Sequence, residues 1–169
     1  MATGARRRCA HQHGAIWKNR PVGSIGDIGS FSLQLSKVLT AGEGGVLTTS
    51  NKNLYTRLDA LRNCGRRPKP DKPKGDKGSG QYGSEGDLVQ SGNYRITEFQ
   101  AGLLLAQMTR LEEQTRKREE NARYLASLLE EIPGLQPARM YEGCPRNGYH
   151  LFMMRYDPEP FAGLSRGKF

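Results

Sequence analysis

The segment from residue 31 to residue 49 constrains the fold of this 169-residue chain more than any other. Apolar and polar residues alternate in Phe-Ser-Leu-Gln-Leu at 31–35, which is typical of a β-strand with one buried face. The turn Ala-Gly-Glu-Gly-Gly at 41–45 then leads into a second strand-like run at 46–49. The pattern predicts a hairpin-like pair of strands, with Lys37 on the loop that connects them.

Two helical patterns follow this pair. Ser50 or Asn51 is expected to cap a helix that runs to about residue 63 and stops at Gly65. Thr97 and Gln100 form a capping box at the start of a second helix, which Pro133-Gly134 would end. Its apolar faces are expected from Phe99, Leu103, Ala106, Leu111, Tyr124, Leu125, Leu128 and Leu129. With further strands expected in 9–18 and 149–156, this order predicts an α/β protein.

The charge of the chain is unevenly distributed. It has 26 basic and 17 acidic residues and a net charge of +9. The basic residues gather at 6–8 and at 66–77, where no apolar residue is available for packing, so both segments are expected to be flexible and solvated. A basic module that binds nucleic acid remains an alternative, although the segment lacks interleaved aromatics. No apolar run reaches the roughly 20 residues of a membrane span, and no secretory signal is evident, which favours a cytoplasmic protein.

The three cysteines do not form a recognisable framework. Cys9, Cys64 and Cys144 are an odd number without a C-x-x-C pair, so the sequence indicates neither disulfides nor a zinc ribbon. On an extended strand, Cys9, His11 and His13 would share one face and could hold a metal ion. No fourth ligand is evident nearby, and pocket-lining or buried polar residues are the preferred interpretation.

The surroundings of Lys37 suggest a specific chemistry. From spacing alone, an ordinary exposed lysine explains this residue. However, the hydroxyls of Ser32 and Ser36 and the backbone N–H groups of the glycine turn can hold a phosphate. A partly desolvated lysine can also act as a nucleophile toward carbonyls. A phosphate site beside such a lysine leads to the hypothesis of pyridoxal phosphate as cofactor.

Four sequence blocks together carry a family resemblance. They are the run 32–45 around Lys37, Leu-Arg-Asn-Cys-Gly-Arg at 61–66, Gly-Asn-Tyr-Arg-Ile-Thr-Glu-Phe-Gln-Ala at 92–101, and Glu-Glu-Asn-Ala-Arg-Tyr-Leu at 119–125. The chain resembles the DegT/StrS family of pyridoxal-phosphate aminotransferases, which act on keto sugars and keto cyclitols in polysaccharide and aminoglycoside pathways. The resemblance implies an aspartate-aminotransferase-like (fold type I) large domain and transfer of an amino group from an amino-acid donor. The branch that acts on inosose-type ketones is the most similar.

The resemblance also implies roles for individual residues. Lys37 matches the lysine that binds the cofactor covalently and moves the proton of the substrate. Ser32 matches the hydroxyl that holds the cofactor phosphate, and His11 matches a position near the ring hydroxyl. Asn93 matches a segment that reaches into the neighbouring subunit, so a homodimer with composite sites is implied.

Other positions are less regular. Gln34 and Glu43 are expected near the same pocket without a defined role. Arg8 stands where the family has an aspartate that pairs with the pyridinium nitrogen, and residues 1–8 match nothing in the family. By the resemblance, 9–134 is part of the large domain and 135–169 begins the small C-terminal domain. We therefore expect an incomplete chain, and a piece without catalytic activity is the alternative to an enzyme.

Overall fold

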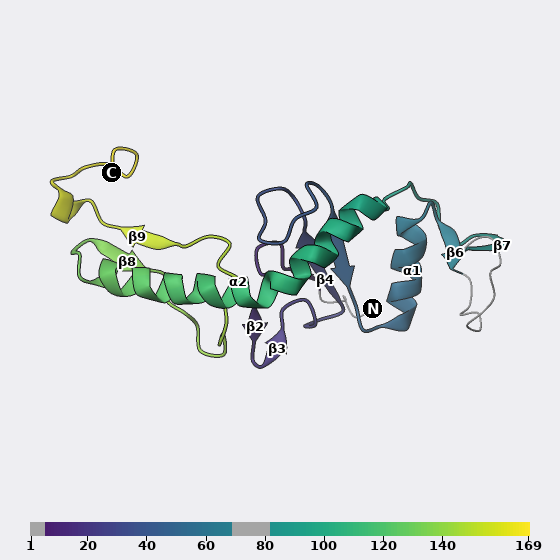
Figure 1. Ribbon diagram of the computed structural model, residues 1–169, viewed down its shortest axis with the longest axis horizontal. Coiled ribbons are helices and arrows are strands. Elements are labelled where there is room, and N and C mark those ends of the chain that lie inside the picture. The colour runs from purple at the N-terminus through teal and green to yellow at the C-terminus, as the bar shows by residue number, and fades with distance from the viewer. Residues whose placement is uncertain (1–5, 69–81) are drawn as a thin grey trace.

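A mixed three-stranded sheet carries the predicted hairpin in the computed structural model, which describes residues 6–68 and 82–169 (Figure 1). Its strand order is β1 (Arg6–Arg8), β4 (Ile28–Ser32) and β5 (Gly45–Thr48). β4 and β5 pair antiparallel from Gly29↔Thr48 to Ser32↔Gly45, which confirms the hairpin and places Lys37 in its loop. The first strand lies earlier than predicted because the backbone of Leu33 already bonds within the loop. Its N–H donates to Gly44 O and its carbonyl accepts from Ala41 N–H.

The beginning of the described chain differs from the prediction. Basic residues 6–8 form β1, which pairs parallel with β4 from Arg6↔Ile28 to Arg8↔Ser30. Residues 9–15 fold into turns instead of a strand, since Gln12 N–H donates to Cys9 O and Ala15 N–H donates to Gln12 O. The short strands β2 (Ile16–Trp17) and β3 (Arg20–Pro21) follow as an antiparallel pair. The short strand and turn predicted within 9–18 are therefore present, but the strand begins only at Ile16, since backbone pairing with β4 ends at residue 9.

Both predicted helices are present with the expected caps. α1 spans Lys52–Arg62, and the Asn51 side chain accepts from the N–H groups of Asn53 and Leu54. The helix ends where Gly65 N–H donates back to Ala60 O at 2.8 Å. α2 spans Glu98–Glu130 and begins with the predicted capping box of Thr97 and Gln100.

The packing of α2 departs from the predicted apolar faces. Buried positions on the helix are Leu104, Thr115 and Ala122, whereas Phe99 is 93% exposed. The core near the hairpin consists of Leu33, Ala41 and Leu104, with Leu39 and Ile96 packed against it. Apolar spacing identified α2 as a helix but did not show which residues the rest of the chain covers. Among the described residues, no helix is long and apolar enough to cross a membrane.

The remaining strands form two small antiparallel pairs. β6 (Arg66–Pro68) pairs with β7 (Tyr82–Asp87). Most of the basic segment expected at 66–77 lies outside the described residues. β8 (Leu135–Pro137) pairs with β9 (Met154–Tyr156), so the strand predicted at 149–156 is correct for its last three residues. A 3₁₀ turn, η1 (Glu159–Phe161), follows.

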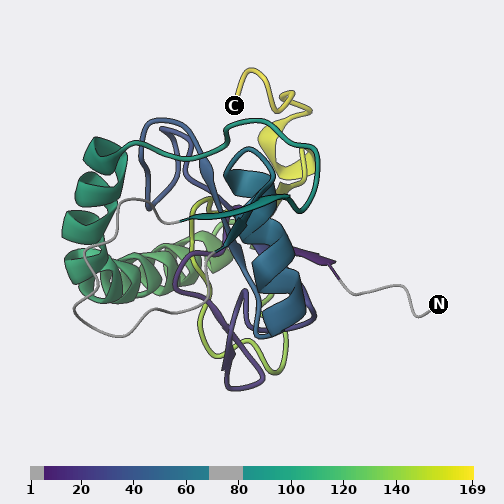
Figure 2. The ribbon, with the colours of Figure 1, turned by 90° about the vertical axis from the view of Figure 1, so that its right-hand side faces the viewer.

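α2 connects the two ends of the molecule. Its first half lies beside the hairpin, and its last turns lie beside β8 and β9 (Figure 1). In the view turned by 90°, α1 and the first half of α2 lie on different sides of the segment that carries β4 and β5 (Figure 2). The hairpin loop with Lys37 is thus held from the α2 side.

Candidate functional site

Lys37 meets a histidine from a distant turn. Its Nζ lies 3.0 Å from Nε2 of His11, and its backbone N–H closes a turn on Gln34 O at 2.9 Å. A charged lysine can only donate, so while Lys37 is protonated, Nε2 of His11 accepts and the ring carries its proton on Nδ1. Lys37 is half-buried and His11 is exposed. The structure therefore brings together two of the residues expected at the cofactor site.

Two glutamines of α2 hold the loop that contains Lys37. Gln107 clamps Thr40, since its Oε1 accepts from Thr40 N–H at 3.1 Å and its Nε2 donates to Thr40 O at 2.7 Å. Gln100 Nε2 donates to the carbonyls of Ala41 (3.1 Å) and Glu43 (3.0 Å). Backbone groups of residues 40–43 are thereby satisfied without a regular strand. α2 therefore fixes the position of this loop.

A third residue of the site, His150, was not predicted from the sequence. Its ring centroid lies 4.6 Å from that of His11, with the two planes tilted by 44°. His150 lies far from His11 in sequence, within a run predicted as a strand. No local pattern signals such a contact, because tertiary packing alone creates it.

Hydrogen bonds to the first turns of the chain bring the segment before His150 into place. The Arg146 guanidinium donates through Nε to Gly14 O at 2.8 Å and forms a bidentate pair with Glu112 at 2.5 and 2.7 Å. Gly148 N–H donates to Gln12 Oε1 at 3.2 Å. These contacts fix residues 12 and 14, which follow His11, against residues 146 and 148, which precede His150.

The charges near the site are positive or neutral. Burial lowers the pKa of His13, and the nearby charges on Lys37 and Arg118 act in the same direction. Burial also lowers the pKa of His150, with further contributions from Lys37 and His11. No carboxylate acts on either histidine among the described residues. Uncharged imidazoles beside a lysine and a guanidinium suit an anionic ligand.

His13 is the most deeply buried of these groups. Its side chain is 4% exposed, and neither ring nitrogen has a hydrogen-bond partner among the described residues. Its ring lies 5.2 Å from that of Phe31 on β4. Cys9 is also buried, whereas His11 is exposed, so these three residues do not share a strand face. The described residues contain no group of three or more possible metal ligands.

The other expected residues are placed differently. Ser32 ends β4, and its Oγ accepts from Gln34 N–H at 3.3 Å. Gln34 Oε1 accepts from the N–H and O–H of Ser36, so this side chain serves the turn. Asn93 is exposed, and its Oδ1 accepts from the backbone and side chain of Arg95. Glu43 contributes its carbonyl to Gln100, and its side chain is exposed.

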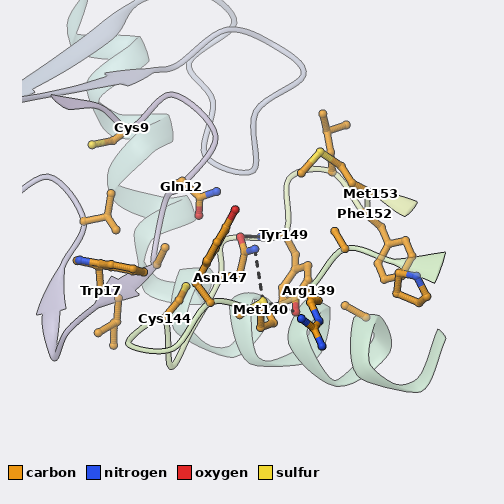
Figure 3. Close-up of a pocket in the computed structure, with 18 of the residues that line it drawn as sticks. Cys9, Gln12, Trp17, Arg139, Met140, Cys144, Asn147, Tyr149, Phe152 and Met153 are labelled. Atoms are coloured by element: carbon orange, nitrogen blue, oxygen red, sulfur yellow. Dashed lines mark hydrogen bonds between the residues drawn. The ribbon is translucent and has the colours of Figure 1, made fainter. Parts of the chain in front are cut away.

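A separate cavity of about 1100 Å³ lies between the first turns, the second half of α2 and the segment 137–153 (Figure 3). Among the residues that line it are Trp17, Arg139 and Tyr149, whose hydroxyl contacts the sulfur of Met140 at 3.4 Å. Lys37, Ser32, His11 and Asn93 do not line this cavity. Arg8, at the position where the resemblance implies an aspartate, does line it. The cavity and the Lys37 site are therefore distinct.

Comparisons with curated proteins agree with the sequence motifs. The chain is 39% identical over 156 residues to L-glutamine:2-deoxy-scyllo-inosose aminotransferase of Streptoalloteichus tenebrarius, covering 92% of this chain and 36% of that protein. It is 40% identical over 147 residues to the protein of the same name from Streptomyces fradiae, covering 87% and 34%. The chain thus spans about a third of the length of these relatives.

Solved structures show the same fold. The chain superposes on 3-amino-5-hydroxybenzoic acid synthase with a TM-score of 0.71 and 32% identity, covering 89% of this chain and 37% of that one. It superposes on AtS13 from Actinomadura melliaura with a TM-score of 0.77 and 26% identity, covering 96% and 41%. These neighbours confirm the predicted α/β class and the partial aspartate-aminotransferase-like fold. A profile of the DegT/DnrJ/EryC1/StrS aminotransferase family matches residues 7–165, and the chain belongs to that family.

Proposed function

We propose that this chain serves pyridoxal-phosphate-dependent transamination, with an amino acid such as L-glutamine as donor and a keto cyclitol or keto sugar as acceptor. Family membership and the names of the relatives support this proposal. The observation that carries it is the contact of Lys37 Nζ with His11 Nε2 at 3.0 Å, on a loop fixed by α2. These relatives are named for a glutamine donor and an inosose acceptor, which favours the cyclitol branch.

The described residues fit the cofactor at its aldehyde and its anionic groups. Lys37 and uncharged imidazoles provide a nucleophile without a competing carboxylate, and the positive surroundings suit a phosphate and a phenolate. The fit is incomplete on the side of the ring nitrogen: Arg8 stands at the sequence position of the implied aspartate, and it lines the separate cavity rather than the Lys37 site. When bound, the cofactor supplies an electron sink that makes a C–H bond of the substrate acidic.

The other functions of the site are assigned to individual residues of the chain. We assign Lys37 to covalent attachment of the cofactor and to moving a proton through Nζ. His11 keeps this amine oriented through Nε2, and Ser32 donates its hydroxyl toward the phosphate. Asn93, which is exposed, is assigned to the pocket of a neighbouring subunit. Gln34 and Glu43 are assigned supporting positions in the loop.

The proposal extends to assembly and location. We propose a homodimer with composite sites, supported by the exposed apolar residues Phe99 and Leu103 near the hairpin end of α2. A cytoplasmic location suits the proposed substrates. We also keep the division into part of a large domain at 9–134 and the start of a small domain at 135–169 as a proposal.

Trapping of the cofactor tests the function. The chain is incubated with pyridoxal phosphate and reduced with borohydride, and the modified peptide is identified by mass spectrometry. We expect a phosphopyridoxyl group on Lys37, its absence in Lys37→Ala, and no labelling of the exposed Lys52 under the same conditions. L-Glutamine added before reduction should convert the bound cofactor to its amine form, which absorbs at shorter wavelength. Equal labelling of both lysines would contradict the proposal.

A further inference from the structure

The rings of His11 and His150 are in contact, and hydrogen bonds hold the backbone near both residues in place. The two rings lie 4.6 Å apart, and the segment that precedes His150 is tied to residues 12 and 14, which follow His11 in the chain. His11 is otherwise exposed, so its ring has few other neighbours to prevent rotation. The orientation of His11 determines whether Nε2 reaches Lys37.

We propose that His150 is a positioning residue of the Lys37 site, whose ring holds the ring of His11 with Nε2 directed at Lys37 Nζ. The role in catalysis rests on the proposed function, whereas the positioning itself can be tested without cofactor. Nothing in the names of the relatives assigns a role to this residue. Through His150, the segment after α2 completes a site built on the hairpin loop.

The charge state of His150 supports this role. The groups that face it are Lys37 on the hairpin loop and His11 on the first turns, and His150 in turn acts on the buried His13. α2 contributes Arg118, whose guanidinium donates to Gly148 O at 3.3 Å. Burial lowers the pKa of His150, and the nearby charges of Lys37 and His11 act in the same direction. His150 therefore stays neutral over a wider pH range, and it can lie against His11 without repelling Lys37.

The tautomer of His11 is the direct readout. In protein labelled with ¹⁵N-histidine, long-range ¹H–¹⁵N spectra distinguish the two neutral forms at a pH above the histidine range. We expect His11 as the Nδ1–H form in the wild-type protein, and a mixture in Lys37→Met, where the donor is absent. His150→Ala should likewise lose the pure Nδ1–H form. His150→Phe keeps a flat ring and should retain most of it.

Controls separate positioning from general disruption. Leu151→Ala changes an exposed neighbour of His150 and should leave the His11 tautomer unchanged. If His150→Ala, with wild-type circular dichroism, keeps the pure Nδ1–H form, the proposal is wrong. It is also wrong if the phenylalanine variant behaves like the alanine variant, since packing of a ring would then not be the cause.

A second measurement leaves His150 intact and covers the case in which its variants do not fold. The pKa of His150 is followed by NMR in the wild-type protein and in Lys37→Met. It should rise in Lys37→Met, because a nearby positive charge is removed. The matched variant Lys52→Met removes a charge that does not act on His150, and no change is expected. If the pKa of His150 is the same in the wild-type protein and in Lys37→Met, the proposal is wrong.

Cofactor trapping distinguishes the two proposals. If pyridoxal phosphate labels Lys37 more slowly in His150→Ala and not at all in Lys37→Ala, both proposals are supported. If the wild-type chain is never labelled while the tautomer responds to His150→Ala, the proposed function fails and the positioning role stands. If labelling is normal and the tautomer does not respond, the positioning role alone fails.

Discussion

Two glycines with almost the same backbone conformation provide a quantitative test of the packing around the site. Gly14 has φ +77° and Gly42 has φ +78°, so alanine pays a similar backbone cost of roughly 1 kcal/mol at either position. Their surroundings differ. A Cβ on Gly42 meets nothing within 4 Å, whereas a Cβ on Gly14 lies 2.9 Å from Oγ1 and 3.4 Å from Cγ2 of Thr115.

Thr115 cannot easily move away from an added methyl group. Its side chain is fully buried, its hydroxyl donates to Leu111 O at 2.7 Å, and it accepts from Arg118 at 2.9 Å. Overpacking at such a position costs about 1 to 3 kcal/mol. We therefore expect Gly42→Ala to lower the free energy of unfolding by about 1 kcal/mol and Gly14→Ala by about 2 to 4 kcal/mol.

Urea unfolding followed by circular dichroism measures both variants. The double variant Gly14→Ala/Thr115→Ala removes the atoms nearest the new methyl group, so it should be more stable than the sum of the single changes predicts, by at least about 1 kcal/mol. Equal losses in the two glycine variants, together with simple additivity in the double variant, would refute the reasoning. The contact between the first turns and α2 would then not be as tight as described.

Three further outcomes are expected. Because burial lowers the pKa of His13 from its ordinary 6.5, the free energy of unfolding should be highest above that pH and fall as the pH drops below it; urea unfolding of His13→Leu at several pH values should show a smaller fall. Asn51→Ala removes the cap of α1 and should cost about 1 kcal/mol in the same assay, whereas Asn53→Ala should cost clearly less. Phe99→Asp should reduce self-association in sedimentation velocity and change the free energy of unfolding by no more than about 0.5 kcal/mol, since this side chain is exposed.

Local signals in the sequence predicted the local structure well. The caps at Asn51 and Thr97 and the glycine turn after Lys37 each depend on residues within a few positions, and the structure confirms all three. β1 was missed because three consecutive arginines carry no apolar signal, and only pairing with β4 makes them a strand. β8 was missed because its three residues are too few to show a strand pattern, and only pairing with β9 makes them a strand.

The candidate site could be predicted only in part. Lys37 came from a sequence motif and His11 from a position implied by the family resemblance, and the structure brings them within 3.0 Å of each other. His150 could not be found, because its approach depends on contacts of residues 146 and 148 with the first turns. The apolar residues of α2 were recognised as helical, but spacing alone does not reveal that Phe99 stays exposed in this chain.

The number of residues along α2 determines which of its side chains reach the two loops of the site. Gln100 and Gln107 fix the hairpin loop, while Thr115 and Arg118 contact Gly14 and Gly148. The helix rises about 1.5 Å and turns about 100° per residue, so these contacts depend on an exact count of residues between them. One residue inserted between Gln107 and Thr115 would turn every later side chain by about 100° and separate the two loops that meet at Lys37. The number of residues along α2 therefore determines the relative orientation of the parts of the site. This constraint includes positions whose own side chains make no contact.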